Sequence, residues 1–236
     1  MGTVRTAKEI VRHALHVCGW RRDMPHLRQR TRQERFAEIY ASGFWKHGAK
    51  ETPASGTGSS LQATAELREE LPALVRRLEV TSVLDVGCGD FTWMQYVDLG
   101  CPYIGVDIVP SVIDQNTRLY GSDHRTFLTC DAVADDLPAA DLVLCREVLF
   151  HLSLDDCMAT LRHIVSTKSP YFMATTDRGT GFNADILSGD YRLLNLEIAP
   201  FNLPKPTFEF EESGDGLAPL GRVLGLWMLE DLKFRN

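Results

Sequence analysis

Acidic residues and one histidine follow apolar runs of the chain, at points where strands are expected to end. Asp107 closes the run from Tyr103, Asp131 comes directly after Cys130, and His151 lies shortly after a further apolar run. Carboxylates at such positions can accept hydrogen bonds from ribose hydroxyls or from the amino group of a base. A histidine there, with an unperturbed pKa of about 6.5, can act as a general base. These residues predict a ligand site at the carboxyl edge of a parallel sheet.

A glycine turn is expected to form the floor of the same site. Residues 82–90 read Ser-Val-Leu-Asp-Val-Gly-Cys-Gly-Asp, an apolar run that suits a strand covered on both faces and stops at Gly87 and Gly89. Glycines permit a tight turn and let a ligand lie against bare backbone. Residues 91–98 are predicted to begin a helix whose N-terminal amides face that ligand. Strand, turn and helix together predict a nucleotide-binding corner.

The elements that must position these residues alternate along the chain. Strands are predicted at 82–86, 103–107, 126–130, 141–145 and 171–175, and helices at 61–78, 92–99, 110–121 and after Ser153. This alternation predicts an α/β, doubly wound, mostly parallel Rossmann-like sheet. A C-terminal antiparallel hairpin of 207–211 and 222–228 is expected to complete seven strands. The irregular stretch 177–206 is unusually long, so it is expected to be an insert that forms the acceptor side of a pocket.

Residues 1–60 are predicted to be an N-terminal helical appendage followed by a Gly/Ser-rich lid, and residues 61–236 the main domain. Apolar residues recur at helical spacing in 3–19, and the pattern repeats in 28–42. Residues 1–35 hold nine Lys/Arg and three acids, which gives a net charge of +6. The whole chain has a net charge of −7, so the remaining residues carry −13. A basic arm of this kind binds an anionic partner such as RNA, a membrane or a phosphorylated substrate, or else lies on the protein's own acidic body. We favour the second interpretation, and do not expect a nucleic-acid partner, because the arm lacks interleaved aromatic residues.

Composition narrows the class of protein. The chain is 44% hydrophobic and 24% charged, as is typical of a globular protein. It has no apolar run of about 18 residues, so no membrane insertion is expected. Six scattered cysteines without a C-x-x-C pair are interpreted as reduced thiols of a cytoplasmic protein, and no cluster has convincing metal-ligand spacing, so no metal is predicted. A monomer or homodimer is expected.

The choice of nucleotide rests on what surrounds the glycine turn. A dinucleotide-binding dehydrogenase requires G-x-G-x-x-G, but Thr92 stands at the position of the third glycine. The runs 83–89, 103–107, 130–132 and 141–152 together resemble class I S-adenosylmethionine-dependent methyltransferases. The tail 189–204 is similar to an uncharacterised bacterial subgroup of small-molecule methyltransferases. Phe91 departs from the family pattern, in which many members have another glycine.

The resemblance implies S-adenosyl-L-methionine as the cofactor, and it implies roles for individual residues. Asp107 would accept both ribose hydroxyls, Asp131 would accept from the adenine amino group, and the Ala132 amide would meet a ring nitrogen. For Asp131, a plain turn aspartate is the competing interpretation. The cofactor-binding residues expected in this way are Trp45, Gly58, Ser59, Asp85, Gly87, Cys88, Gly89, Asp107, Ile108, Asp131, Ala132, Arg146 and Glu147.

On the acceptor side, His151 is the candidate base, and a histidine that only packs or caps a helix is the alternative. The residues expected to bind the acceptor are Asp177, Arg178, Asp190, Arg192 and Asn195. Their alternative role is an internal network that holds the 177–206 segment in place. Trp45 has two interpretations as well, a cation–π contact with the sulfonium or core packing.

Four functions follow from these residues. The first is methyl transfer to a hydroxyl of a small polar acceptor, a sugar, glycan or natural product. The second is N-methylation of a small amine, and the third is RNA modification that uses the basic arm. The fourth is a non-catalytic cofactor-binding role in a larger assembly. A nicotinamide dehydrogenase stays a distant alternative.

Overall fold

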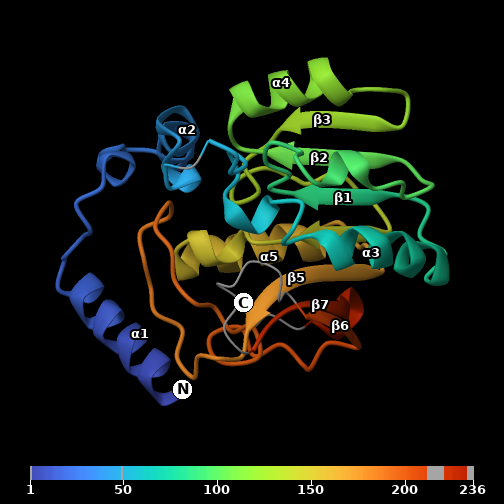
Figure 1. Ribbon diagram of the computed structural model, residues 1–236. Coiled ribbons are helices and arrows are strands. Elements are labelled where there is room, and N and C mark those ends of the chain that lie inside the picture. The colour runs from blue at the N-terminus through green and yellow to red at the C-terminus, as the bar shows by residue number, and fades with distance from the viewer. Residues whose placement is uncertain (1, 49, 212–220, 233–236) are drawn as a thin grey trace.

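A seven-stranded sheet runs through the computed structural model, which describes residues 2–48, 50–211 and 221–232. The strand order is β3-β2-β1-β4-β5-β7-β6 (Figure 1). The strands are β1 (Val83–Val86), β2 (Tyr103–Asp107), β3 (Arg125–Thr129), β4 (Leu142–Cys145), β5 (Tyr171–Asp177), β6 (Phe208–Glu211) and β7 (Arg222–Met228). Strands β1 to β5 are parallel, and β7 runs antiparallel to both β5 and β6. The predicted doubly wound sheet with its closing hairpin is confirmed; the residues that connect β6 and β7, 212–220, lie outside the described ranges.

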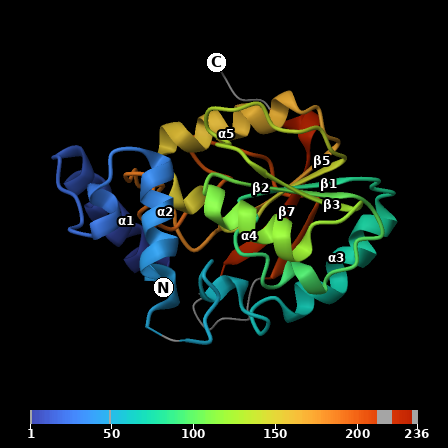
Figure 2. The ribbon, with the colours of Figure 1, turned by 90° about the horizontal axis from the view of Figure 1, so that it is seen from above.

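Helices cover both faces of the sheet. They are α1 (Gly2–Val17), α2 (Arg32–Ser42), α3 (Ala65–Arg77), α4 (Pro110–Tyr120) and α5 (Leu154–Ser166). Figure 2, seen from above, places α5 on one face and α3 on the other. Because side chains alternate along a strand, Leu84 and Val86 enter the core with α5, whereas Val83 enters the core with α3. Strand β1 is therefore buried on both faces, as its apolar run predicted.

Helix starts explain where the observed boundaries differ from the predicted ones. Helix α2 begins at Arg32 and not at residue 28, because Thr31 accepts from the Glu34 amide and Glu34 bonds back to the Thr31 amide. This capping box satisfies two amides of the first turn and fixes the start. Ser153 caps α5 by accepting from the Asp156 amide, so the helix begins after Ser153 as predicted.

The predicted helix at 92–99 is wrong. Only one 3₁₀ turn, Met94–Tyr96, forms there. Phe91 adopts φ +58°, and Asp90 accepts from the Thr92 amide, so the backbone turns where a helix would have to begin. Phe91 is fully buried against Tyr103, which fixes this conformation. The glycine turn therefore has no helix N-terminus facing the ligand site.

The N-terminal arm lies on the acidic body through ion pairs. Arg5 contacts Asp177 at 3.5 Å, and Arg22 contacts Asp190 at 2.8 Å. Figure 1 shows α1 beside the segment that follows β5 and apart from the sheet. These contacts are the ones expected if the basic arm serves the protein's own structure. In the described part of the chain, no helix is both long enough and apolar enough to cross a bilayer.

Candidate functional site

A pocket opens at the carboxyl ends of β1, β2 and β4, below α2 and the 43–60 segment. It brings together nearly all of the residues predicted from the strand ends. These are Trp45, Ser59, Asp85, Gly87, Cys88, Gly89, Asp107, Ile108, Asp131, Ala132, Arg146, Glu147 and His151. The parallel strands produce this arrangement, because their carboxyl ends meet at one edge.

The 43–60 segment is fastened over the glycine turn. Ser55 Oγ accepts from the Asp90 amide at 2.8 Å, and the Ser55 amide donates to Asp90 Oδ2 at 3.2 Å. Gly89 has φ +59°, and a Cβ there would lie 2.2 Å from Ser55 Oγ. The second glycine is thus required both by its backbone conformation and by the lid above it. Ser55 and Asp90 were not singled out by the sequence, since their pairing spans a loop.

Two buried carboxyls lie beside the glycine turn. Asp107 accepts from the amides of Gly89 at 3.2 Å and Val109 at 3.0 Å. Asp85 accepts from the Tyr103 hydroxyl at 2.7 Å. Burial disfavours the charged form and raises the pKa of each carboxyl to about 6, against these hydrogen bonds. Both groups are therefore poised to respond to a ligand that donates hydrogen bonds.

Asp131 is both a turn residue and a pocket residue. Its Oδ1 accepts from the Val133 amide at 3.1 Å, and its Oδ2 accepts from Arg32 at 2.7 Å. Arg32 lines the pocket, although the sequence did not indicate it. The signal was present on α2, because Arg32, Phe36 and Tyr40 recur every four residues and so share the helix face that covers the pocket.

Arg146 and Glu147 anchor the lid from below. Arg146 donates to the Gly58 carbonyl at 3.0 Å. Gly58 lies just behind the pocket lining, and a Cβ on it would fall 1.8 Å from Glu147 Oε2. Glu147 itself adopts φ +58°. Its backbone amide donates a hydrogen bond to Thr175 Oγ1 at 3.0 Å, and Arg222 lies 3.3 Å from its Oε1, and these contacts hold the conformation. A non-glycine residue kept in this conformation is typical of functional sites.

His151 ends the short 3₁₀ turn Leu149–His151 that follows β4. Its Nδ1 lies 2.9 Å from the Asp190 carbonyl, which can only accept, so Nδ1 carries the proton and Nε2 keeps its lone pair. The Trp45 ring packs 4.9 Å from the imidazole, centroid to centroid. Burial, with smaller contributions from Arg192 and Arg222, lowers the pKa of His151 to about 4 against the hydrogen bond to the Asp190 carbonyl. The half-buried imidazole is therefore neutral at physiological pH.

The structure does not bring the predicted acceptor residues into the pocket. Arg192, fully buried, donates to the carbonyls of Leu152 at 2.6 Å and Phe150 at 3.3 Å. Asn195 exchanges hydrogen bonds with Asn183 and donates to the Thr180 carbonyl. Both residues hold the irregular segment in place.

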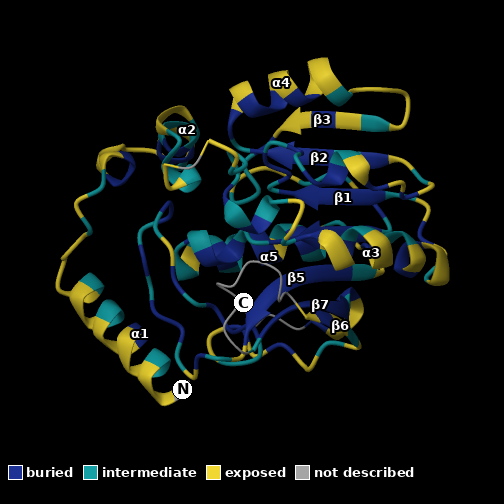
Figure 3. Cartoon of the chain, in the orientation of Figure 1, coloured by how far each residue is buried: buried dark blue, intermediate teal, exposed yellow. Residues whose placement is uncertain are grey.

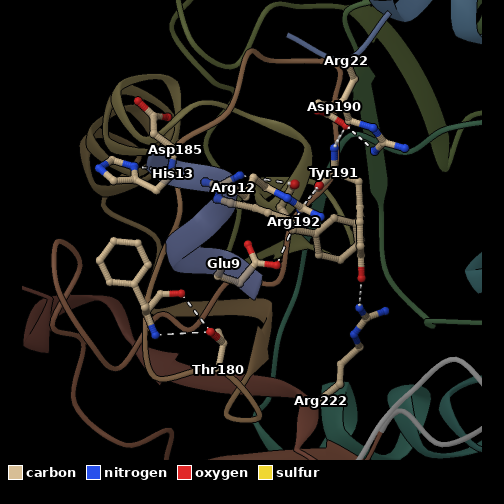
Figure 4. A network of polar contacts seen from close by, with 12 residues as sticks. Glu9, Arg12, His13, Arg22, Thr180, Asp185, Asp190, Tyr191, Arg192 and Arg222 are labelled. Atoms are coloured by element: carbon tan, nitrogen blue, oxygen red, sulfur yellow. Dashed lines mark hydrogen bonds and ion pairs between the residues drawn. The ribbon is translucent and has the colours of Figure 1, made fainter. Parts of the chain in front are cut away.

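The remaining three residues form ion pairs outside the pocket. Asp177 lies near Arg5, and Asp190 pairs with Arg22 (Figure 4). Arg178 contacts two glutamates, one of which is Glu209 at 2.8 Å. The alternative interpretation of the tail, an internal network, is the one that this geometry supports. Asp190 still reaches the site indirectly, through its carbonyl bond to His151.

No metal centre is placed by the described residues, among which no group of three or more His, Cys, Asp or Glu side chains is arranged to hold an ion. The pocket contains two carboxyls whose pKa is about 6, a glycine turn, aromatic walls and one neutral imidazole. This set can bind a polar nucleoside-like group at one end and remove a proton at the other.

Comparisons with known proteins agree with this geometry. Residues 60–173 match the family model described as a methyltransferase domain. Among solved structures, magnesium protoporphyrin IX methyltransferase from Synechocystis PCC 6803 with bound SAM aligns with a TM-score of 0.59 and 15% identity, over 84% of this chain and 97% of that one. The methyltransferase domain of bacterial CtHen1-CN aligns with a TM-score of 0.53 and 15% identity, over 70% and 99%.

Shorter alignments and one further comparison complete these findings. Alignments with bacterial CtHen1-C and with the SAH-bound form of the Synechocystis enzyme span 66% and 56% of those chains. A search of the curated proteins finds no match. At these identities, the likeness to solved structures establishes the fold.

Proposed function

Because this chain carries a methyltransferase domain over residues 60–173, on the fold of the class I S-adenosylmethionine-dependent enzymes, we propose that it methylates a hydroxyl of a small polar acceptor with His151 as the base. The acceptor class is a sugar, a glycan or a natural product. The observation that supports the choice of a hydroxyl is the tautomer of His151, whose Nδ1 bond to the Asp190 carbonyl leaves the Nε2 lone pair available.

The cofactor, S-adenosyl-L-methionine, fits the residues at the strand ends. Asp107 can accept from ribose hydroxyls in addition to the amides it already binds, since a carboxylate has about four lone-pair sites. We assign Asp131 and the Ala132 amide to the adenine; both residues line the pocket, and Arg32 pairs with the Asp131 carboxylate. We assign Ser59 and Arg146, which line the pocket, to the methionine end, with the Gly58 carbonyl fixing the Arg146 guanidinium. Bound in this way, the cofactor supplies an electrophilic methyl group on a sulfonium.

The proposed reaction needs alignment, dryness and one proton acceptor. His151 Nε2 would take the proton of the acceptor hydroxyl as its oxygen bonds to the methyl carbon; the cofactor would supply that methyl group and keep the electron pair of the sulfur–carbon bond. Holding the two reacting atoms in line is worth several kcal/mol of the barrier, about 7–11 in the best-oriented cases. The lid, fastened by Ser55 and Asp90, and the ring of Trp45 exclude water from this space.

A matched pair of acceptors tests the proposal. The measurement is S-adenosylhomocysteine release with an alcohol and with the amine of the same skeleton, between pH 6 and 8. The alcohol is expected to be methylated at a nearly constant rate, because His151 stays neutral over this range. An amine with a pKa of about 10 is protonated there, so its rate would rise about tenfold per pH unit. Methylation of the amine alone, with that slope, would replace the proposal by N-methylation.

RNA modification has less support from the structure. Arg5, Arg22 and Arg32 of the basic arm already pair with acids of the protein body. An arm whose cations are engaged in this way has fewer charges left for phosphates. RNA binding that falls steeply with salt and disappears without residues 1–35 would reverse this preference.

Replacing Asp107 by asparagine is expected to weaken S-adenosylmethionine binding about ten- to a hundredfold, since hydrogen bonds to a charged acceptor contribute about 1.5–3 kcal/mol. Wild-type affinity is also expected to decline below about pH 6. The pKa of the Asp107 carboxyl is about 6, and two hydroxyl donors would favour its ionised form, so binding must release a proton at lower pH. Titration calorimetry across pH 5 to 8 measures both effects.

The control for Asp107 is Asp114→Asn on the exposed face of α4. It makes the same chemical change away from the pocket, so affinity and its pH dependence should stay at the wild-type level. Unchanged affinity in Asp107→Asn itself would remove this residue from the cofactor site.

A further inference from the structure

Helix α1 lies on the protein with its polar face inward. Sorted by helical position, one face carries Arg5, Glu9, Arg12 and His16, and the opposite face carries the apolar residues. Of these four polar residues, Glu9 is buried and the others are half-buried. The apolar spacing at 3–19 thus predicted the helix correctly, but the face that enters the protein is the reverse of the usual arrangement.

Specific polar contacts fix this orientation. The Asp185 amide donates to His13 Nδ1 at 3.1 Å, and the Gly181 amide donates to Thr6 Oγ1 at 2.9 Å. Arg12 donates to the Tyr191 carbonyl and lies 3.6 Å from Glu9 (Figure 4). The bonds of Thr6 and His13 are two helical turns apart, so a rotation of α1 about its axis would break them. These contacts on the polar face therefore keep the apolar face pointing outward.

The outward face is large and apolar. The exposed fractions are 63% for Val4, 49% for Ile10, 58% for Val11, 40% for Leu15 and 69% for Val17. Figure 3 shows α1 as mostly exposed along its length. An exposed apolar stripe of this kind on one helix marks an interaction surface. Trp20, 53% exposed just after the helix, extends the stripe.

Cations border the stripe. A groove between α1 and the segment after β5 has Leu15, Trp20 and Ile186 among its apolar lining and Lys8, Arg21 and Arg22 among its polar lining. Lys8 and Arg21 are exposed, whereas Arg22 pairs with Asp190, which lines the groove together with Asp185. Apolar residues with a tryptophan, bordered by lysine and arginine, suit the boundary between acyl chains and anionic headgroups.

We propose that the outward face of α1 docks on an anionic lipid surface, with the helix lying in the plane of the membrane. A helix of 16 residues is about 24 Å long, and its inner face is already bound to the protein, so it lies on the bilayer and does not cross it. Lys8 and Arg21 are exposed beside the stripe, and the chain after residue 35 carries −13, so an anionic surface attracts this side and repels the acidic body. This charge asymmetry favours lipid over a second copy of the chain, because pairing two α1 faces would bring their cations together.

The test is sedimentation of the full chain with vesicles of phosphatidylcholine, with and without phosphatidylglycerol. Wild-type protein is expected to bind the anionic vesicles and to be released as salt is raised, since exposed charges are screened. The double variant Val11→Glu/Leu15→Glu is expected to lower the partition coefficient about tenfold or more. Trp20 fluorescence should shift to the blue with anionic vesicles, and the shift should vanish in Trp20→Phe.

Leu119→Glu on α4 is the matched control. Leu119 is 55% exposed, so the variant adds an acid to an exposed leucine on another helix and should bind as the wild type does. Circular dichroism checks that each variant is folded. Failure to bind anionic vesicles, or equal binding to pure phosphatidylcholine, overturns the proposal. A dimer in solution that the double variant abolishes would assign the face to a second copy instead.

Discussion

Replacing His151 by asparagine is expected to lower kcat for a hydroxyl acceptor by about 10²–10⁴-fold, the range that a positioned general base contributes. Asparagine is the informative substitution, because its amide nitrogen takes the place of Nδ1 and can keep the bond to the Asp190 carbonyl. What it lacks is a basic atom at the position of Nε2. The loss therefore reports proton transfer and not the loss of a packing contact. Rates at saturating cofactor and acceptor measure it.

Binding and a second histidine provide the controls. Affinity for S-adenosylmethionine should change less than about threefold in His151→Asn, because the substitution leaves Asp107 and Asp131, the carboxylates proposed to bind the cofactor, unchanged. His124→Ala, at an exposed position before β3, should leave kcat unchanged. If His151→Asn methylates a hydroxyl acceptor at the wild-type rate, His151 is not the general base. In that case His151 would remain a residue that packs beneath Trp45.

The strand-end residues of the pocket were predictable from the sequence for a topological reason. Asp85, Asp107 and Asp131 each stand in or directly after a short apolar run, and parallel strands bring such positions together whatever the loops do. Strand assignments that were off by one residue, as at β3, did not matter. Local pattern and topology suffice when every residue of a site lies on the sheet.

The contacts that complete the site join residues far apart in the chain, which no local pattern encodes. Arg32 reaches Asp131 across 99 positions, and Arg146 reaches Gly58 across 88. Arg192 looked like a ligand-binding cation, yet its partners are backbone carbonyls. A charged residue in an irregular stretch has either role, and only tertiary structure decides between them. The missing helix after the glycine turn has a similar cause, since burial of Phe91 overrides its local preference.

The turn that carries His151 is held by the irregular segment as well as by its own backbone hydrogen bonds. Arg192 binds the carbonyls of Phe150 and Leu152 on either side of His151. Asp190, two residues earlier, accepts from His151 Nδ1. The segment after β5 thus positions the proposed base without lining the pocket. It acts on His151 by holding the 3₁₀ turn in place.

Replacing Arg192 by leucine is therefore expected to destabilise the protein by about 3–5 kcal/mol, the cost of breaking a buried charged network by removing one member. Arg192 is fully buried, and its guanidinium serves two carbonyls at 2.6 and 3.3 Å. Leucine takes the guanidinium donor away from the Leu152 carbonyl, whereas the Phe150 carbonyl keeps the backbone amide of residue 192. It also removes a cation that lowers the pKa of buried Glu9. Lysine should recover only part of the loss, because one ammonium cannot span the same acceptors. Urea unfolding measures the change.

Two further variants separate charge from packing. Arg162→Leu, at an exposed position of α5, is the same substitution without buried partners and should stay within about 0.5 kcal/mol of the wild type. Adding Glu9→Gln to Arg192→Leu should restore part of the lost stability, since it removes the carboxylate that burial disfavours. A loss below about 1 kcal/mol in Arg192→Leu would show that water replaces the guanidinium. Where stability does fall, kcat should fall at temperatures at which Arg192→Leu is still folded, because the carbonyls that Arg192 binds flank the proposed base.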